Sequence, residues 1–283
     1  MTAYRWVVPS TYPFLKGHGT ENDFVLLPDH DGSVHGDLAA ARVVALCDRR
    51  AGIGGDGVLR VIRTAVADPS QAEDAEWYMD YRNADGSVSE MCGNGIRVFA
   101  RHLVDEGLAD PRNPIPIATR DGVKLVTVEG EQITADLGNP KVLGETMIGI
   151  GDRCWPARHL DMGNPHAVVF VDDLDEAGPL VEPPVHDSAV FPEGVNVEFV
   201  VRRGERHVAM RVHERGSGET RSCGTGACAA MVGSALADGR TPDEDLAYRV
   251  DLPGGTLTVT WTTGDDVLLT GPALIVARGI SSL

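Results

Sequence analysis

The 283-residue chain lacks the long apolar runs that mark integral membrane proteins. No stretch approaches the roughly 20 consecutive apolar residues of a membrane-spanning helix, so no membrane partner is expected. The first ten residues also lack a basic segment followed by an apolar core and a small-residue cleavage site. We therefore expect a cytoplasmic protein.

Signals for disulfides and metal clusters are missing as well. The five cysteines are an odd set in a chain without an export signal, which argues against a disulfide framework. There is no C-x-x-C pair and no His/Cys cluster at zinc spacing, and the spacing of Cys223 and Cys228 alone is a weak metal signal. The sequence predicts no metal site.

Positive charge is scarce. The formal net charge is −17 and no basic stripe offsets it, which disfavours nucleic acid as a partner. Of the three lysines, Lys16, Lys124 and Lys141, none lies in a context that suggests a Schiff base with pyridoxal phosphate. The sequence therefore favours chemistry without a cofactor, in which local groups hold any substrate carboxylate.

Two similar cysteine turns are present, one in each half of the chain. The first reads Met91-Cys92-Gly93-Asn94-Gly95-Ile96, and the second reads Ser222-Cys223-Gly224-Thr225-Gly226-Ala227. Each Cys-Gly-x-Gly run leads into an apolar segment, which predicts a loop that becomes the N-terminus of a buried helix. Such a helix end offers N–H groups and partial positive charge, which favour a thiolate and can hold a carboxylate.

A structural role for these cysteines is the alternative interpretation. A lone cysteine before a helix is usually a small buried hydrophobic residue. Two copies in matching contexts favour a chemical role instead, and the flanking glycines would let a ligand approach the backbone closely. We therefore expect a duplicated fold in which each half contributes one thiol.

Strand and helix patterns follow the same order in both halves. In the first half we expect a helix at 38–50, strands at 58–62 and 77–82, and the cysteine helix from 93 to about 108. In the second half, strands at 167–171, 194–199 and 208–214 precede the second cysteine helix, and four short strands between 248 and 277 close the chain. The glycine-rich turn at 52–57 lacks the lysine of a phosphate loop, so no nucleotide site is predicted.

Five motifs, in the right order, resemble the diaminopimelate epimerase family over nearly the whole chain. They are Gly19-Thr20-Glu21-Asn22-Asp23-Phe24, Asn83-Ala84-Asp85-Gly86-Ser87, Met91-Cys92-Gly93-Asn94-Gly95, Met162-Gly163-Asn164-Pro165-His166, and Glu214-Arg215-Gly216-Ser217-Gly218-Glu219-Thr220 with Ser222-Cys223-Gly224-Thr225-Gly226. The resemblance implies an isomerase that converts LL-diaminopimelate to meso-diaminopimelate in lysine and peptidoglycan precursor biosynthesis, without a cofactor.

The resemblance also implies the fold. It is an α+β fold with two pseudo-symmetric halves, each a mixed, barrel-like β-sheet wrapped around a central helix, and with the active site in the cleft between them. We expect the halves at residues 1–131 and 132–268, with a C-terminal strand in 269–283 that returns to the first half. A homodimer is a further expectation.

The chemistry fits two thiols. Inverting an α-carbon without an electron-sink cofactor requires a base on one face and an acid on the other, so the two thiols titrate as a coupled pair. By resemblance, Cys92 and Cys223 are these groups, and His166 and Glu214 tune them. The residues that resemble the family's substrate-binding set are Asn22, Asn83, Gly93, Asn94, Asn164, Asn196, Glu214, Arg215, Gly224 and Thr225. Without the resemblance, the asparagines read equally well as ordinary turn residues.

One departure and two rival functions remain. Much of the family carries glutamine where this chain has Gly57, so another group must replace that side-chain contact. A proline or hydroxyproline racemase would also pair two cysteines, but that group typically has histidine at the position of Asn94. A protein that only binds a dicarboxylic amino acid has no use for an acid/base group on each face of the ligand.

Overall fold

The computed structural model describes residues 11–283. Residues 1–10, on which the expected absence of an export signal rests, lie outside this range. The chain divides into two compact units. The first unit holds the chain up to Gly19 together with Asp23–Ile133 and Ala273–Leu283, and the second holds Thr20–Asn22 and Thr134–Pro272.

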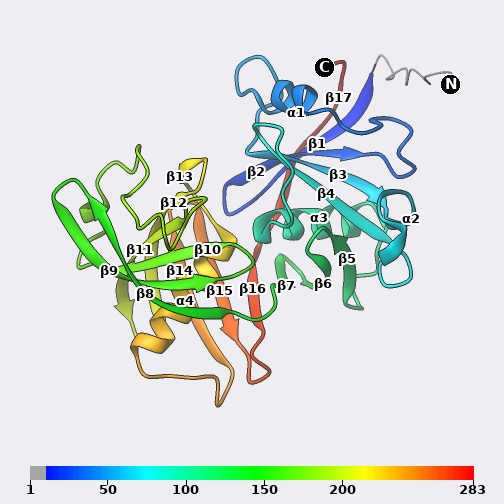
Figure 1. The fold of residues 1–283 in the computed structure, drawn as a ribbon. Coiled ribbons are helices and arrows are strands. Elements are labelled where there is room, and N and C mark those ends of the chain that lie inside the picture. The colour runs from blue at the N-terminus through cyan, green and yellow to red at the C-terminus, as the bar shows by residue number, and fades with distance from the viewer. Residues whose placement is uncertain (1–10) are drawn as a thin grey trace. The chain divides into compact units, whose positions relative to one another are not determined.

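The first unit is a mixed sheet packed on helix α3. Its strands are β1 (Tyr12–Gly19), β2 (Asn22–Pro28), β3 (Gly57–Arg63), β4 (Trp77–Asn83), β5 (Ile115–Thr119), β6 (Gly122–Glu129) and β17 (Leu274–Ser281), and its helices are α1 (Ala40–Cys47), α2 (Thr64–Ala67), the 3-10 helix η1 (Pro69–Gln71) and α3 (Gly93–Asp105). Strand β2 is parallel to β3, β3 is antiparallel to β4, and β4 is parallel to β5. Strand β17 runs antiparallel beside β1, so the first and last strands of residues 11–283 are neighbours in this sheet (Figure 1).

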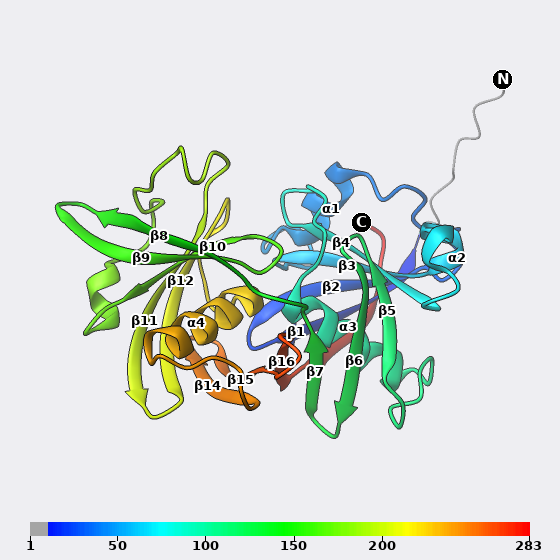
Figure 2. The ribbon, with the colours of Figure 1, turned by 60° about the horizontal axis from the view of Figure 1, so that its bottom comes forward.

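The second unit repeats this plan around helix α4. Its strands are β7 (Gln132–Asp136, which begins in the first unit), β8 (Lys141–Ile150), β9 (Arg153–Asp161), β10 (Pro165–Phe170), β11 (Asn196–Gly204), β12 (His207–Glu214), β13 (Gly218–Thr220), β14 (Leu246–Leu252), β15 (Gly255–Trp261) and β16 (Val267–Pro272), and its helices are the 3-10 helix η2 (Leu174–Ala177) and α4 (Gly224–Ala237). Strand β10 is parallel to β11, β11 is antiparallel to β12, and β12 is parallel to β14. Figure 2 shows α4 lying along these strands.

The matching order of strands makes the two units comparable residue by residue. In each unit a parallel pair is followed by an antiparallel strand, then by the cysteine-capped helix, and then by a strand parallel to the last. Strands β2, β3 and β4 therefore correspond to β10, β11 and β12, and α3 corresponds to α4. The predicted duplication is present as a repeated topology.

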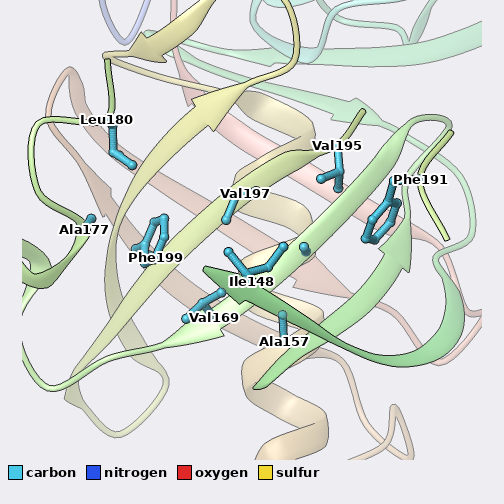
Figure 3. Close-up of a cluster of buried hydrophobic side chains, with 10 residues drawn as sticks. Ile148, Ala157, Val169, Ala177, Leu180, Phe191, Val195, Val197 and Phe199 are labelled. Atoms are coloured by element: carbon cyan, nitrogen blue, oxygen red, sulfur yellow. The ribbon is translucent and has the colours of Figure 1, made fainter. Parts of the chain in front are cut away.

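Alternation along the strands assigns one face to the helix and the other to separate apolar clusters, because successive side chains point to opposite faces. Figure 3 shows Val169, Val197 and Phe199 in such a cluster with Ile148 and Phe191. Residues between them, such as Glu198, therefore point to the opposite face of the sheet, where α4 packs. Helix α4 is apolar on nearly every side, as a helix enclosed by a sheet must be.

The helix predicted at 38–50 is shorter in the structure. Helix α1 begins at Ala40 and ends at Cys47, because Leu38 adopts a left-handed conformation with φ 44° and Asp48 leaves the helical region. Within residues 11–283, no helix combines the length and the apolar character needed to cross a membrane.

Candidate active site

The first cysteine turn forms the N-terminus of α3. Cys92 is the N-cap, with extended backbone angles, and its Sγ accepts a hydrogen bond of 3.3 Å from the backbone N–H of Gly95. Gly93 and Asn94 are the first residues of the helix, so their N–H groups have no carbonyl partner within it. The buried guanidinium of Arg97 donates to Asn94 Oδ1 at 2.7 Å and fixes that side chain against the helix.

The second cysteine turn has the same geometry at the N-terminus of α4. Cys223 is the N-cap, and its Sγ accepts a 3.3 Å hydrogen bond from the N–H of Gly226. The hydroxyl of Thr225 lies 3.6 Å from the same sulfur atom. Gly224 and Thr225 occupy the positions that Gly93 and Asn94 hold in α3. Both predicted thiols therefore sit on helix N-termini, where backbone N–H groups point toward them.

Little space is left beside the third residue of each helix, Gly95 in α3 and Gly226 in α4. A Cβ at Gly95 would lie 3.2 Å from Leu59 Cδ2 and 3.5 Å from Cys92 Sγ. A Cβ at Gly226 would lie 2.8 Å from Glu198 Oε1 and 3.2 Å from Cys223 Sγ. Leu59 on β3 and Glu198 on β11 are equivalent positions of the repeated sheet, so the two thiols lie above different side chains.

Acidic groups surround the second thiol. Glu214 ends β12, and its carboxylate accepts a hydrogen bond from the hydroxyl of Thr220. Desolvation raises the pKa of the Glu214 carboxyl. Burial raises the pKa of the Cys223 thiol well above its usual value, and the charges of Glu214 and Glu198 raise it further, against hydrogen bonds from Thr225 and Gly226. Cys223 is therefore a protonated thiol in this state.

Glu198 is a residue of this site that the sequence reasoning did not select. Its side chain is fully buried, and its Oε1 lies 2.6 Å from Nδ1 of His166, which is also fully buried. The other ring nitrogen of His166 lies 2.8 Å from Asn164 Oδ1. Burial raises the pKa of the Glu198 carboxyl, against the interaction with His166. The available signal was a glutamate at an alternating position between Val197 and Phe199 of a strand buried on both faces.

The predicted asparagines fall into two groups. In the second unit, Asn164 contacts His166, while Asn196 donates to Pro165 O at 3.1 Å and accepts from the backbone N–H of Arg215 at 2.9 Å. These contacts connect the starts of β10 and β11 with the end of β12. In the first unit, Asn83 ends β4 and donates to Ser87 Oγ at 2.9 Å, as a turn residue does.

Asn22 and Arg215 complete the predicted set. Asn22 is half-buried at the start of β2 and belongs, by its contacts, to the second unit. The Arg215 guanidinium is 41% exposed and lies 3.9 Å from the largely exposed Glu193 carboxylate, a weak pairing that leaves the guanidinium accessible. Within the second unit, the structure thus brings Asn164, His166, Asn196, Glu214, Arg215 and Cys223 into one connected region.

The structure explains why position 57 carries no side chain. A Cβ at Gly57 would lie 2.6 Å from Arg82 O and 2.7 Å from Tyr81 Cε2. The neighbouring strand β4 occupies this space, so a larger residue would require β4 to move. No group of three or more His, Cys, Asp or Glu side chains within residues 11–283 is placed to hold a metal ion.

Solved structures of other proteins share this fold. Structures that share this fold include a phenazine biosynthesis protein of the PhzF family from Bacillus anthracis, with a TM-score of 0.71 at 18% identity, over 96% of this chain and 99% of that one. They also include a hydroxyproline epimerase from Agrobacterium vitis, with a TM-score of 0.67 at 16% identity, over 96% of this chain and 92% of that one. At these identities the likeness concerns the fold alone.

Sequence comparison identifies the family within this fold. The diaminopimelate epimerase family model matches residues 14–143 and 159–276. The chain is 56% identical over 274 residues to the diaminopimelate epimerase of Streptomyces coelicolor, covering 94% of each chain. It is 46% identical over 273 residues to that of Thermobifida fusca, covering 94% of this chain and 96% of the other. The chain belongs to the diaminopimelate epimerase family and is an isomerase, which confirms the resemblance seen in the motifs.

Proposed function

We propose that the protein interconverts LL- and meso-diaminopimelate, with Cys92 and Cys223 as the acid/base pair and without a cofactor. The observation that carries this proposal is the matched pair of N-capping thiols, each 3.3 Å from a backbone N–H of its own helix. Family membership supplies the substrate, because the relatives at 56% and 46% identity are diaminopimelate epimerases. The reaction would serve lysine and peptidoglycan precursor biosynthesis.

The two thiols have different starting states in this proposal. Cys223 holds its proton because burial and two nearby carboxyl groups raise its pKa. It would therefore deliver a proton to the α-carbon while Cys92, as thiolate, removes one from the other face. In the reverse reaction the roles exchange, as microscopic reversibility requires. Because each thiol ends a turnover in the state from which the other began, the two titrate as a coupled pair.

The remaining residues would bind the two ends of the substrate. N–H groups of Gly93, Asn94, Gly224 and Thr225 lie in the first turns of their helices and would stabilise the α-carboxylate and the charge it gains in the carbanion. Arg215 would hold the distal carboxylate by a two-point contact, and Glu214 would accept from a substrate ammonium group. The asparagines Asn22, Asn83, Asn164 and Asn196 would complete the recognition of the substrate.

We also propose a cytoplasmic location and a homodimer. Thiol acid/base chemistry requires reduced cysteines, which the cytoplasm maintains. Cys47, Cys154 and Cys223 form no disulfide, in keeping with that environment. Neither nucleic acid nor a membrane is part of the proposed function.

The test is epimerisation in deuterated water. The full chain is treated with a chelator and incubated with LL-diaminopimelate in the absence of pyridoxal phosphate. The products are separated by chiral chromatography, and their masses are measured by mass spectrometry. We expect the meso isomer with one solvent deuterium at the inverted carbon. Turnover of proline or hydroxyproline in place of diaminopimelate would show a racemase, and tight binding without deuterium exchange would show a binding protein.

A further inference from the structure

We propose that Glu198 is a positioning residue for the thiol of Cys223: paired with His166, it places a buried acidic group under the first turn of α4 and biases Cys223 to hold its proton. The inference rests on the proposed function, because it assigns the acid of the two-thiol reaction. It concerns a residue outside the set expected to contact the substrate, and it starts from geometry within the second unit.

Glu198 and Cys223 flank the same glycine. The Cβ position of Gly226 lies 2.8 Å from Glu198 Oε1 and 3.2 Å from Cys223 Sγ, so at most about 6 Å separates the carboxyl oxygen from the sulfur. Both side chains are buried, Glu198 completely and Cys223 with 5% of its surface exposed. Because solvent does not screen this pair, a thiolate at Cys223 is disfavoured by any negative charge on Glu198.

Hydrogen-bond geometry fixes the number of protons on the Glu198–His166 pair. Nε2 of His166 lies 2.8 Å from Asn164 Oδ1, and with this orientation of the Asn164 amide Nε2 carries a hydrogen. Nδ1 faces Glu198 Oε1 at 2.6 Å, and one further proton must lie between these two atoms, on either side. The pair therefore holds two protons and carries no net charge, as complete burial favours.

The pair is neutral but polar. Its carboxyl end lies beneath the helix turn of Cys223, and its imidazole end lies toward Asn164. The second carboxyl oxygen, Oε2, is buried and has no hydrogen-bond partner within residues 11–283. No donor in that range therefore neutralises Oε2, and the carboxyl group is the end of the pair that lies nearest the thiol. The helix N-terminus favours a thiolate, and the carboxyl groups of Glu198 and Glu214 oppose it.

The other titratable groups near the thiol are few. Glu214 approaches from β12, Glu198 from β11 and, behind Glu198, His166 from β10. Arg221, the closest arginine along the chain, pairs with Glu21 and donates to Pro253 O. Among these side chains, Glu214 and Glu198 raise the pKa of the Cys223 thiol, against the hydrogen bonds from Thr225 and Gly226.

The first unit has the same arrangement of strands and helix without the Glu198–His166 pair. At the position of Glu198 it has Leu59, and at the position of His166 it has Phe24, both fully buried. A leucine thus fits beneath an equivalent cysteine turn, which makes Glu198→Leu a variant that removes the acid while keeping the volume. Glu198→Gln keeps a hydrogen-bonding partner for His166 without an ionisable group.

The experiment measures alkylation of each thiol by iodoacetamide as a function of pH, in the substrate-free full chain, with peptide-resolved mass spectrometry. For Glu198→Leu we expect Cys223 to react about tenfold faster near neutral pH, because one unit of pKa changes the thiolate fraction tenfold. Glu198→Gln should also increase the alkylation rate of Cys223. Cys92 in the same samples is the internal control, and its rate should not change.

Val168→Ala is the packing control. Val168 is the neighbour of Glu198 on β10 and is fully buried against α4, so its truncation loosens the same layer without touching the ring of His166. Nitrogen-15 NMR of labelled histidines, assigned with His166→Gln, reports the pair directly. In the wild type Nε2 should carry a proton, and the proton between Nδ1 and Oε1 should disappear in Glu198→Leu.

Four outcomes would overturn the proposal. The Cys223 rate could stay unchanged in Glu198→Leu although NMR shows that the pair is lost. Both thiols could accelerate equally, or Val168→Ala could match the effect, which would mean general loosening. Nε2 of the wild type could lack a proton. None of these measurements uses turnover, so a failure of the proposed epimerase reaction would appear separately, as wild-type protein without deuterium exchange.

Discussion

Cys92 and Cys223 occupy the same local architecture above different side chains. Each is the N-cap of a helix, each accepts a 3.3 Å hydrogen bond from the third residue of that helix, and each lies above a strand that pairs in the same order with its neighbours. Beneath Cys92 lies Leu59, and beneath Cys223 lies Glu198. The repeated fold therefore contains two similar cysteine turns that lie above different side chains.

The equivalent strands β4 and β12 also end in different side chains. Strand β4 ends at Asn83 and continues with Ala84, whereas β12 ends at Glu214 and continues with Arg215. The charged groups expected to hold a substrate ammonium and a distal carboxylate therefore belong to the second unit. The first unit instead has a buried arginine within α3, Arg97, at the position that Cys228 holds in α4. The comparison suggests that the first unit provides mainly the acid/base group and the second unit provides most of the recognition.

The largest effect should come from removing either thiol. We expect Cys92→Ala and Cys223→Ala each to lower kcat for epimerisation by at least ~10²–10⁴-fold, the usual contribution of one general acid or base. Each variant should still exchange deuterium slowly into one stereoisomer without inverting it, since the remaining thiol faces only one side of the carbon. Chiral analysis in deuterated water measures both quantities.

Cys154→Ala is the matched control, because Cys154 is exposed on β9 and has no proposed role. It should retain wild-type activity. Equal exchange of deuterium into both stereoisomers by both thiol variants would contradict the assignment of one thiol to each face, and full activity in either variant would exclude the two-thiol reaction.

Local sequence signals were sufficient for the cysteine turns. Cys-Gly-x-Gly before an apolar run predicts an N-cap and a buried helix, and both helices begin at the glycine after the cysteine. The helix at α1 was placed two residues too early because its apolar spacing extends to Leu38, whose left-handed backbone no periodicity reveals. The long hairpin of β8 and β9 was not predicted at all, since much of it is exposed and its alternation is weak.

The side chains beneath the turns could not be predicted in the same way. Glu198 becomes part of the site only through the register of β11 between β10 and β12, a contact between segments about 30 residues apart. The asparagines were selected through the family motifs, because in the sequence alone each also fits an ordinary turn. Asn83 does hydrogen-bond within its turn, and its predicted role toward the substrate stays a prediction.

The two units should also differ in their response to acid. In the first unit, burial lowers the pKa of His35 and of His102 to about 4. These rings are neutral in the folded state and ionise near pH 6.5 when unfolded, so they stabilise the fold above that pH and lose this contribution as the pH falls toward 4. Each of these two histidines should lower the free energy of unfolding by about 2 kcal/mol at pH 5 relative to pH 7.

In the second unit, buried carboxyl groups change stability with pH in the direction opposite to that of the buried histidines. Burial also lowers the pKa of His159 and His213, but the pKa values of Glu198 and Glu214 are raised. A raised carboxyl pKa gives stability that is present at low pH and lost as the pH rises. At acid pH these carboxyl groups therefore offset part of the stability that is lost at the histidines of the second unit. Hydrogen exchange at pH 7 and 5, corrected for intrinsic rates, should show a larger loss of protection in β1–β3 than in β10–β12. Equal losses in both sets of strands, or a smaller loss in the first, would refute this difference.

The smallest effect we predict concerns Arg215, which has no charged counterpart in the first unit. Its backbone N–H donates to Asn196, so Arg215→Lys leaves this contact in place and changes only the guanidinium. Lysine offers a point charge where arginine offers two parallel donors, so one of two contacts to the distal carboxylate should be lost. We expect KM for diaminopimelate to rise about tenfold with little change in kcat, within the range of one charge-assisted hydrogen bond. Discrimination against shorter amino acids should weaken in parallel, because they lack the group that Arg215 recognises. Steady-state kinetics with diaminopimelate, followed by competition with norvaline, a shorter amino acid without a second carboxylate, measures both effects. A variant with reduced kcat and an unchanged KM would assign Arg215 to proton transfer and place recognition of the distal carboxylate elsewhere.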